Sequence, residues 1–412
     1  MGTSFIDDFY DYTLSMESPN SYIQWASYAC LAAIMRDNYY WEDDNRQRRV
    51  YPNIYVILYA RASATRKDPP IVLAEQLIRE VGSTKIFAGR FSIQASIKRM
   101  AELGINPNNK EQIKGGSCTM MSREIADLFA EADSATKILT DLYDYHSTWT
   151  NDILKNEGIQ EVKNVCINLL AASNEVLFKE VFSDNSLAGG LLRRIFLVAE
   201  SRKRHHTDPM NPILINQGLR KPMIDHLKWI ASHKGQIIFS EGAREEFGAF
   251  YKSIETASYE DETGIMSSVH TSAQKLAMIF AAAEYNFEFI VSKKHMERAI
   301  DDVMKMVRNY KLITPMAGEV GNKYKQQLGP EILKILLKAP SHQMSRETLI
   351  RRLTGICNDI RTFDTAISWL TDESHYIKAE RLGDGSMGFI LTENFLNLYQ
   401  KKTGEKNATS SK

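Results

Sequence analysis

Short apolar runs alternate with amphipathic helical patterns along the first half of the chain. The strongest run, residues 54–59, consists of β-branched, aromatic and leucine side chains and follows Pro52 closely, which predicts a buried strand. Four further runs have the same character. The five predicted strands span residues 54–59, 85–88, 117–122, 165–171 and 195–199. Because helical segments separate them, the pattern predicts an α/β fold with a mostly parallel sheet.

A small, polar loop joins the first strand to a helix that Pro69 and Pro70 open. Strand, tight loop and helix form the frame of a phosphate-binding loop, in which backbone N–H groups and a lysine contact an anion. Lys67 has the position of that lysine, and the small residues before it allow a ligand to approach closely. The candidate nucleotide-binding residues are Ser63, Ala64, Thr65, Arg66, Lys67 and Asp68.

The match to the pattern G-x-x-x-x-G-K-[ST] is incomplete. Arg61 and Arg66 replace its glycines, and Asp68 replaces the hydroxyl that would hold Mg²⁺. Asp68 can still contact Mg²⁺ directly or through water. From the loop alone, the alternative is a plain turn between a strand and a helix, with basic residues on the surface.

Polar residues follow two other predicted strands. Glu124 follows the strand 117–122, where P-loop enzymes place acidic residues that hold Mg²⁺ and polarise the attacking water. Glu124 comes 57 residues after Lys67, a spacing that suits neighbouring strands joined by a crossover. Asn174 follows the strand 165–171, where a polar side chain can sense the γ-phosphate. Helix capping is the alternative for both residues.

Arg193 and Arg194 lie between the turn at Gly189–Gly190 and the strand 195–199. Two arginines beside a buried strand favour an anionic partner, and in ring-shaped NTPases such an arginine completes the neighbouring subunit's site. The alternative is an ion pair with a surface carboxylate. Ligands of parallel sheets bind at the carboxyl ends of the strands, and we expect all of these candidate side chains to meet there.

Changes of pattern divide the chain into six parts. An N-terminal helical segment precedes the sheet domain, a helical subdomain packs on that domain, and a stretch with one proline and three glycines links it to a C-terminal domain. The parts span residues 1–50, 51–210, 211–314, 315–329, 330–398 and 399–412. The last part has the polar composition of disordered tails. Within the sheet domain, residues 136–149 have the pattern of an amphipathic helix.

Residues 330–398 have the order helix, helix, helix and β-hairpin, which predicts a winged helix-turn-helix. The third helix carries one basic residue, Arg361, among several acidic ones, which argues against sequence-specific reading of a major groove. Contact with the phosphate backbone remains open, as does a role in protein contact. The candidate nucleic-acid-binding residues are Arg351, Arg352, Arg361, Lys378 and Arg381.

The composition is ordinary for a globular protein, with 43% hydrophobic and 25% charged residues in 412. The net charge of zero excludes a global attraction to nucleic acid, so any such surface is local.

The four cysteines are scattered in apolar runs, which indicates reduced thiols. No run approaches the roughly 20 apolar residues of a membrane span. The acidic N-terminus also differs from a signal peptide, so we expect a cytoplasmic protein without membrane contact.

The chain resembles the helicase-like P-loop ATPases of phages, plasmids and integrated elements. Their domain is often labelled as of unknown function and is encoded near primases and polymerases. The resemblance covers about residues 20 to 312, and its carriers are the stretches PNIYVILYARASATRKDPP, SREIADLFAE, LTDLYDYHSTW, NLLAASNEVLF, GGLLRRIFLV and AQKLAMIFAAAE. Ser63, Arg66, Lys67 and Asp68 look like a variant of the phosphate loop found in that family.

The resemblance implies a RecA- or AAA+-like core that binds ATP and Mg²⁺. It also implies Glu124 as the catalytic acid, Asn174 as the sensor and Arg194 as the arginine acting in trans. We therefore expect an ATP-dependent DNA translocase or replicative helicase that works as a homo-oligomeric ring, with DNA and a primase or polymerase as partners. The alternative is a non-hydrolysing DNA-binding scaffold or helicase loader in which the phosphate loop is structural.

Overall fold

The computed structural model describes most of the chain in two compact units, Met1–Ile313 and Thr314–Lys412. The described residues are 4–43, 48–60, 65–89, 91–101, 104–105, 112–113, 115–129, 132–151, 160–182, 190–208, 210, 215–258, 265–353, 360–368, 370–371, 375–382, 385–397 and 399.

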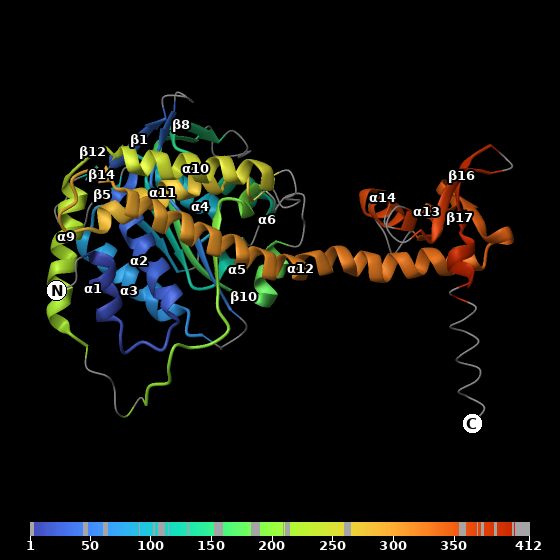
Figure 1. The fold of residues 1–412 in the computed structure, drawn as a ribbon, viewed down its shortest axis with the longest axis horizontal. Coiled ribbons are helices and arrows are strands. Elements are labelled where there is room, and N and C mark those ends of the chain that lie inside the picture. The colour runs from blue at the N-terminus through green and yellow to red at the C-terminus, as the bar shows by residue number, and fades with distance from the viewer. Residues whose placement is uncertain are drawn as a thin grey trace. The chain divides into compact units, whose positions relative to one another are not determined.

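A five-stranded parallel sheet forms the centre of the first unit (Figure 1). Its strands are β3 (Tyr55–Ala60), β4 (Lys85–Ala88), β7 (Cys118–Ser122), β10 (Ile167–Asn174) and β11 (Ile195–Ala199). They stand in the order β11-β3-β10-β7-β4, and each neighbouring pair is parallel. The five predicted strands and the α/β class are confirmed. The expectation that β3 and β7 are neighbours is wrong, because β10 lies between them.

The sheet is buried because its central strands carry apolar side chains on both faces. All six residues of β3 are buried, as are the first seven of β10, which is typical of a parallel sheet covered on both sides. Helix α2 (Asn20–Met35) packs against both strands. Its side chains are buried nearly all round, so α2 is a core helix and not a surface helix.

The other described helices of the first unit surround this core. They are α1 (Phe5–Tyr12), α3 (Asp68–Val81), α4 (Ile93–Ala101), α5 (Ile125–Leu128), α6 (Ala132–Asp141), α7 (Glu175–Val181), α9 (Arg220–Ser232), α10 (Glu241–Ser258), α11 (Val269–Ala283) and the first part of α12 (Lys293–Leu337), with 3₁₀ segments at Arg36–Asn38 and Gln217–Leu219. The helical character expected over residues 211–314 is present. These helices, like α1 and α2, share one apolar core with the sheet.

Short strands complete the first unit. β1 (Tyr39–Asp43) pairs with β2 (Arg48–Val50) and with β12 (Gly235–Gln236). β13 (Ile238–Phe239) pairs with β14 (Ile290–Val291), and β5 (Gly104–Ile105) pairs with β6 (Gln112–Ile113). β8 (His146–Asn151) pairs with β9 (Gln160–Val165). The last pair corrects the helix predicted over residues 136–149. Helix α6 ends at Asp141, and the Trp149 indole donates to the Asp141 carboxylate at 2.6 Å, which ties the strand to the helix end.

The second unit has a small core of its own. It contains the end of α12, a 3₁₀ segment at Pro340–His342, α13 (Arg346–Leu353), α14 (Ile360–Ser368) and an antiparallel sheet in the order β15 (Gln343–Ser345), β17 (Met387–Leu391), β16 (Ile377–Arg381). Leu336, Leu349, Phe363 and Phe389 are buried together in this core. Of the expected tail, residues 399–412, only Tyr399 belongs to the described residues.

The linker expected over residues 315–329 is not a loop, because helix α12 runs through it. Isolated glycines cost a helix only about 1 kcal/mol each relative to alanine, and the residues between them here are mostly good helix formers. The division between the two units nevertheless falls beside this stretch, at residue 313.

Two expectations from composition can be compared with the structure. Among the helices of the described residues, none combines the length and apolar character needed to cross a bilayer. Cys30, Cys118 and Cys166 are buried free thiols, and Cys357 lies outside the described residues.

Candidate functional site

The carboxyl ends of three neighbouring strands open onto a cavity of about 670 Å³, which we call the carboxyl-edge pocket. β3, β10 and β7 are parallel and stand side by side, so the residues after them meet at one edge of the sheet. The pocket brings together the predicted residues Lys67, Glu124 and Asn174. Its full lining is Thr65, Arg66, Lys67, Asp68, Pro69, Arg123, Glu124, Ser173, Asn174 and Leu177.

The candidate phosphate loop leaves the sheet at a buried strand end and leads into α3. The buried Thr65 hydroxyl donates to the Tyr22 hydroxyl at 3.4 Å, and Tyr22 donates to the Tyr59 carbonyl. Lys67 is the N-cap residue of α3, and prolines fill the first turn, where their missing N–H groups would have no acceptor in the helix. Ser63 and Ala64 lie outside the described residues.

Lys67 is half-buried at the mouth of the pocket. Burial lowers the pKa of its ammonium, while the carboxylates of Asp68 and Glu124 act in the opposite direction. Within the described part of the chain, no hydrogen bond or ion pair holds this ammonium. A partly dehydrated cation gains from an anionic ligand, because the ligand replaces the lost water.

Glu124 is exposed at the end of β7 and begins the four-residue helix α5. Its side chain makes no capping hydrogen bond to that helix. Glu124 is nevertheless the N-cap residue, so the alternative that its carboxylate favours the positive end of the helix remains. The Ser122 hydroxyl donates to the Glu124 carbonyl at 2.6 Å, which fixes the backbone turn after the strand. The carboxylate of Glu124 therefore lies both at the border of the pocket and at the start of α5.

Asn174 does cap a helix. Its Oδ1 accepts the Leu177 backbone N–H at 2.9 Å, at the start of α7. The amide nitrogen is the atom of this side chain that can donate to a ligand. Capping and ligand contact are compatible here, because they use different atoms.

Asp68 and Glu124 are the two carboxylates of the pocket. Mg²⁺ is usually held by one or two carboxylates together with phosphate oxygens and water, so this donor set suits a nucleotide-bound magnesium ion. The described residues contain no group of three His, Cys, Asp or Glu side chains that would hold a metal ion by itself.

Arg193 and Arg194 do not line the carboxyl-edge pocket. They precede β11, whose first residue pairs with Tyr55 at the start of β3, so they lie at the amino end of the sheet. At about 3.3 Å per residue, the six residues of β3 separate the two edges by about 17–20 Å. The expectation that all candidate side chains meet at one edge is therefore wrong for the arginine pair.

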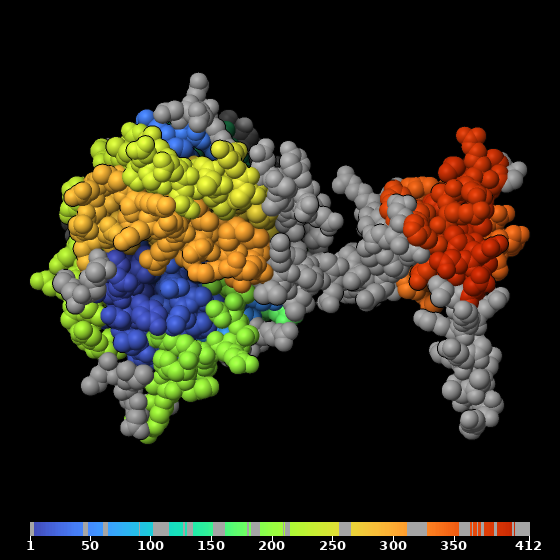
Figure 2. Space-filling view, viewed as in Figure 1, coloured from blue at the N-terminus to red at the C-terminus, as the bar shows by residue number. Residues whose placement is uncertain are grey.

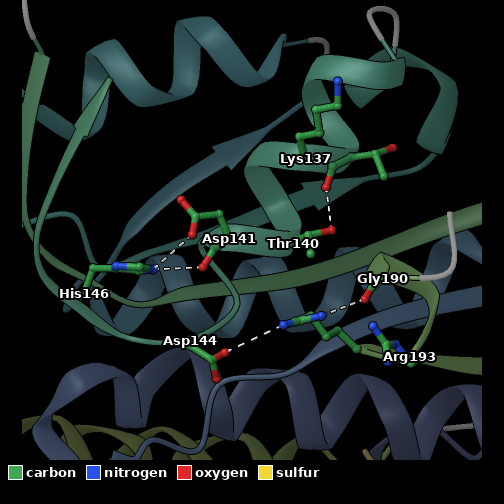
Figure 3. Close-up of a pocket in the computed structure, with 9 residues that line it drawn as sticks. Lys137, Thr140, Asp141, Asp144, His146, Gly190 and Arg193 are labelled. Atoms are coloured by element: carbon green, nitrogen blue, oxygen red, sulfur yellow. Dashed lines mark hydrogen bonds and ion pairs between the residues drawn. The ribbon is translucent and has the colours of Figure 1, made fainter. Parts of the chain in front are cut away.

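The arginines line a second cavity of about 590 Å³, the amino-edge pocket (Figure 3). Arg194 Nη1 donates to the Gly190 carbonyl at 2.8 Å, and Arg194 Nη2 lies 3.8 Å from Asp144 Oδ2. The ion-pair alternative for Arg194 is thus present in the single chain. The other lining residues are Thr136, Lys137, Thr140, Asp141, His146 and Arg193.

The predicted nucleic-acid-binding residues of the second unit lie on separate elements. Arg351 and Arg352 are exposed in the last turn of α13, and Lys378 and Arg381 are exposed on β16. Lys378 forms an ion pair with Glu380 at 2.6 Å, which offsets its charge. The side chain of Arg361 lies outside the described residues.

Sequence reasoning missed Glu17, which contacts the candidate phosphate loop from the connector between α1 and α2. Its carboxylate lies 3.0 Å from Arg66 Nε and 2.7 Å from Lys203 Nζ. These partners are 49 and 186 residues away along the chain, so no local pattern signals the contact.

Comparison with known proteins does not identify a family. No family model matches the chain, and a search of curated proteins finds no match.

Proposed function

We propose that the chain is an ATP-dependent DNA translocase or replicative helicase that works as a homo-oligomeric ring. The observation that carries the proposal is the carboxyl-edge pocket, where a lysine, a carboxylate and an amide from three strand ends border one cavity. Its volume of about 670 Å³ lies within the roughly 300–1,000 Å³ of small-ligand and cofactor sites.

The strand order supports this proposal. Numbered along the chain, the five strands lie in the order 5-1-4-3-2, so one strand separates the strand before Lys67 from the strand before Glu124. The strand between them, β10, ends in Asn174, so the ends of all three strands border one pocket. The resemblance noted in the sequence implies a RecA- or AAA+-like core.

Each residue of the pocket has a role that follows from its atoms. Lys67 would contact the outer phosphates of ATP, and the positive end of α3 favours an anion at the same place. Glu124 would polarise the attacking water, and the Asn174 amide nitrogen would donate to the γ-phosphate. Mg²⁺ bound with the nucleotide would offset phosphate charge, and Asp68 and Glu124 would hold it.

The position of Arg194 is compatible with the proposed ring. Because Arg194 lies at the opposite edge from Lys67, it is too far away to serve the phosphates of its own subunit. A neighbouring subunit's pocket is the site it would complete. The ion pair with Asp144 at 3.8 Å is long and partly exposed, so its loss on assembly would cost little.

DNA contact is assigned to the second unit. The order of its helices and its three-stranded antiparallel sheet are compatible with a winged helix. Arg351, Arg352 and Arg381 are exposed there and suit contact with the phosphate backbone, which positions a protein without reading sequence.

A non-hydrolysing DNA-binding scaffold or helicase loader is the second candidate. Two features favour it: a single acid follows β7, and Asp68 stands where a metal-binding hydroxyl is usual. ATP would then stabilise a conformation or an assembly without being turned over.

Nucleotide titration of a Lys67→Ala variant tests the phosphate-loop assignment. Affinity for an ATP analogue should fall about tenfold or more, which corresponds to about 1.4 kcal/mol, because the variant loses the cation facing the outer phosphates. Lys293→Ala is the control, since Lys293 is exposed and lines neither pocket, so its loss should leave the affinity unchanged. Unchanged affinity in a folded Lys67→Ala chain would reject the assignment.

The two candidate functions differ in one measurement on the wild-type chain. Hydrolysis of ATP that DNA stimulates supports a translocase or helicase. Binding of ATP without hydrolysis, in the presence and absence of DNA, supports the scaffold or loader.

A further inference from the structure

Glu17, outside the carboxyl-edge pocket, joins the phosphate loop to the chain after β11. Glu17 Oε2 accepts from Arg66 Nε at 3.0 Å and from Lys203 Nζ at 2.7 Å. Glu17 Oε1 accepts the Thr207 backbone N–H at 3.2 Å. These donors, Lys203 above all, lower the pKa of Glu17 to about 2, so its carboxylate is charged at neutral pH.

Arg66 needs support because its backbone is left-handed, with φ at 52°. A residue with a Cβ atom meets steric repulsion in this conformation, whereas glycine does not. The Ser18 hydroxyl donates to the Arg66 carbonyl at 2.6 Å, so the residue after Glu17 binds the same loop residue. The connector between α1 and α2 therefore holds both the side chain and the carbonyl of Arg66.

The connector is itself fixed by Arg204. The Arg204 backbone N–H donates to the Glu17 carbonyl at 3.1 Å, and Arg204 Nε donates to the Met16 carbonyl at 2.7 Å. Its guanidinium also contacts the Thr13 carbonyl. In Figure 2 the light green segment after β11 lies against the blue N-terminal helices. Glu17 is thus attached to the body of the first unit.

The Glu17 contact also makes the neighbouring cations Arg66 and Lys67 differ in what they can bind. It compensates the charge of Arg66 and directs that guanidinium to the connector. Lys67 has no carboxylate within ion-pair distance among the described residues. Lys67 is therefore the loop cation that remains for the phosphates of a ligand.

We propose that Glu17 is a positioning residue of the phosphate loop. It holds Arg66 in the left-handed conformation before nucleotide binds, and so replaces the glycine that stands in the usual loop pattern. Two measurements test this inference, and only one of them, the nucleotide affinity, rests on the proposed function.

A mutant cycle in the full-length chain tests the inference, with Glu17→Gln, Arg66→Gly and the double variant. The readouts are hydrogen exchange of the amides of residues 65–67 without nucleotide, and the dissociation constant of a non-hydrolysable ATP analogue. Glu17→Gln should speed the exchange and raise the dissociation constant about tenfold, or about 1.4 kcal/mol. In the Arg66→Gly background the same change should act less than about twofold, because glycine adopts this conformation without support.

Lys203→Gln is the matched control, because it removes the other cation on Glu17 and keeps the Arg66 contact. Loop exchange and affinity should then stay within about twofold of wild type. If Glu17→Gln does not fold, Ser18→Ala removes the bond to the Arg66 carbonyl and is measured in the same way, with Arg66→Gly again as the suppressor.

Two results would overturn the inference: unchanged loop exchange in Glu17→Gln, or an equally large effect in the Arg66→Gly background. A Lys203→Gln variant that disturbs the loop as much as Glu17→Gln would also overturn it. If wild type binds no ATP analogue while Glu17→Gln still loosens the loop and Arg66→Gly suppresses the change, the positioning role stands and the proposed function fails.

Discussion

Replacing Lys275 by methionine should change how the stability of the first unit depends on pH. Lys275 lies in α11 with 2% of its surface exposed. Its Nζ donates to Asn53 Oδ1 at 2.8 Å and lies 3.8 Å from the centre of the Tyr143 ring. Burial lowers the pKa of Lys275 from 10.5 to about 8, against the opposing effect of Asp144.

The sign and size follow from the two protonation states. Below pH 8 the lysine is charged in both the folded and the unfolded chain, and the folded chain carries the full cost of burying the charge. Between pH 8 and pH 10.5 the unfolded chain binds more protons, so the free energy of unfolding rises with pH. The difference between the two pKa values, at 1.36 kcal/mol per pKa unit, gives about 3 kcal/mol.

Denaturant titrations of wild type and Lys275→Met, followed by tryptophan fluorescence, measure this effect. The wild-type free energy of unfolding minus that of the variant should rise by about 3 kcal/mol between about pH 7.5 and about pH 10.5. Burial raises the pKa of several tyrosines in the folded chain, and these tyrosines become free to titrate on unfolding. They do so in both proteins, so their contribution to the difference in the free energy of unfolding cancels. In the variant, Asn53 Oδ1 no longer accepts from Lys275, which adds a constant offset to the difference in the free energy of unfolding at every pH.

Lys293→Met is the matched control, because Lys293 is 58% exposed at the start of α12 and its loss should leave the pH dependence unchanged. A flat difference curve for Lys275→Met would refute the claim that burial destabilises the charged lysine. A difference that falls with rising pH would mean that Asn53 and Tyr143 stabilise the ammonium more than burial destabilises it.

Two further predictions concern the proposed reaction. Glu124→Gln keeps the shape of the side chain but loses the base, so the rate of ATP hydrolysis should fall by about 100-fold or more. The affinity for an ATP analogue should be retained. An unchanged turnover rate would assign the base to another residue. Mixing Arg194→Ala with Lys67→Ala chains should restore part of the DNA-stimulated activity, because a mixed interface can pair an intact loop with an intact arginine. Arginines that act across an interface in this way supply about 10³-fold or more in rate. Both variants are first checked for assembly, and mixtures as inactive as their parents would leave Arg194 with only its ion pair to Asp144.

The five strands of the sheet were predictable because their signal is local. Each is a short, largely apolar run, and the central strands β3 and β10 are buried on both faces. The pair β8 and β9 was not predictable in the same way. The helical pattern continues past Asp141, and it is pairing with residues 160–165, together with the Trp149 bond to Asp141, that turns this segment into a strand.

The carboxyl-edge pocket was predictable from one rule about parallel sheets, that residues after neighbouring strands share an edge. The rule places Lys67 and Glu124 together even though β10 separates their strands. It was misapplied to Arg194, which precedes its strand and so lies at the other edge. Glu17 was beyond prediction, because its contacts join segments that are far apart along the chain.

The opposite placement of Lys67 and Arg194 restricts the kind of assembly in which they can share a site. In a two-fold dimer the same surface faces itself, so both edges of the sheet would have to enter one interface. The pocket with Lys67 and the pocket with Arg194 lie at opposite ends of β3, about 17–20 Å apart along the strand. A head-to-tail contact, in which the amino edge of one subunit meets the carboxyl edge of the next, satisfies both without distortion. Such a contact gives a ring if the rotation between subunits closes and an open helical filament if it does not, so the proposed ring requires a rotation that closes.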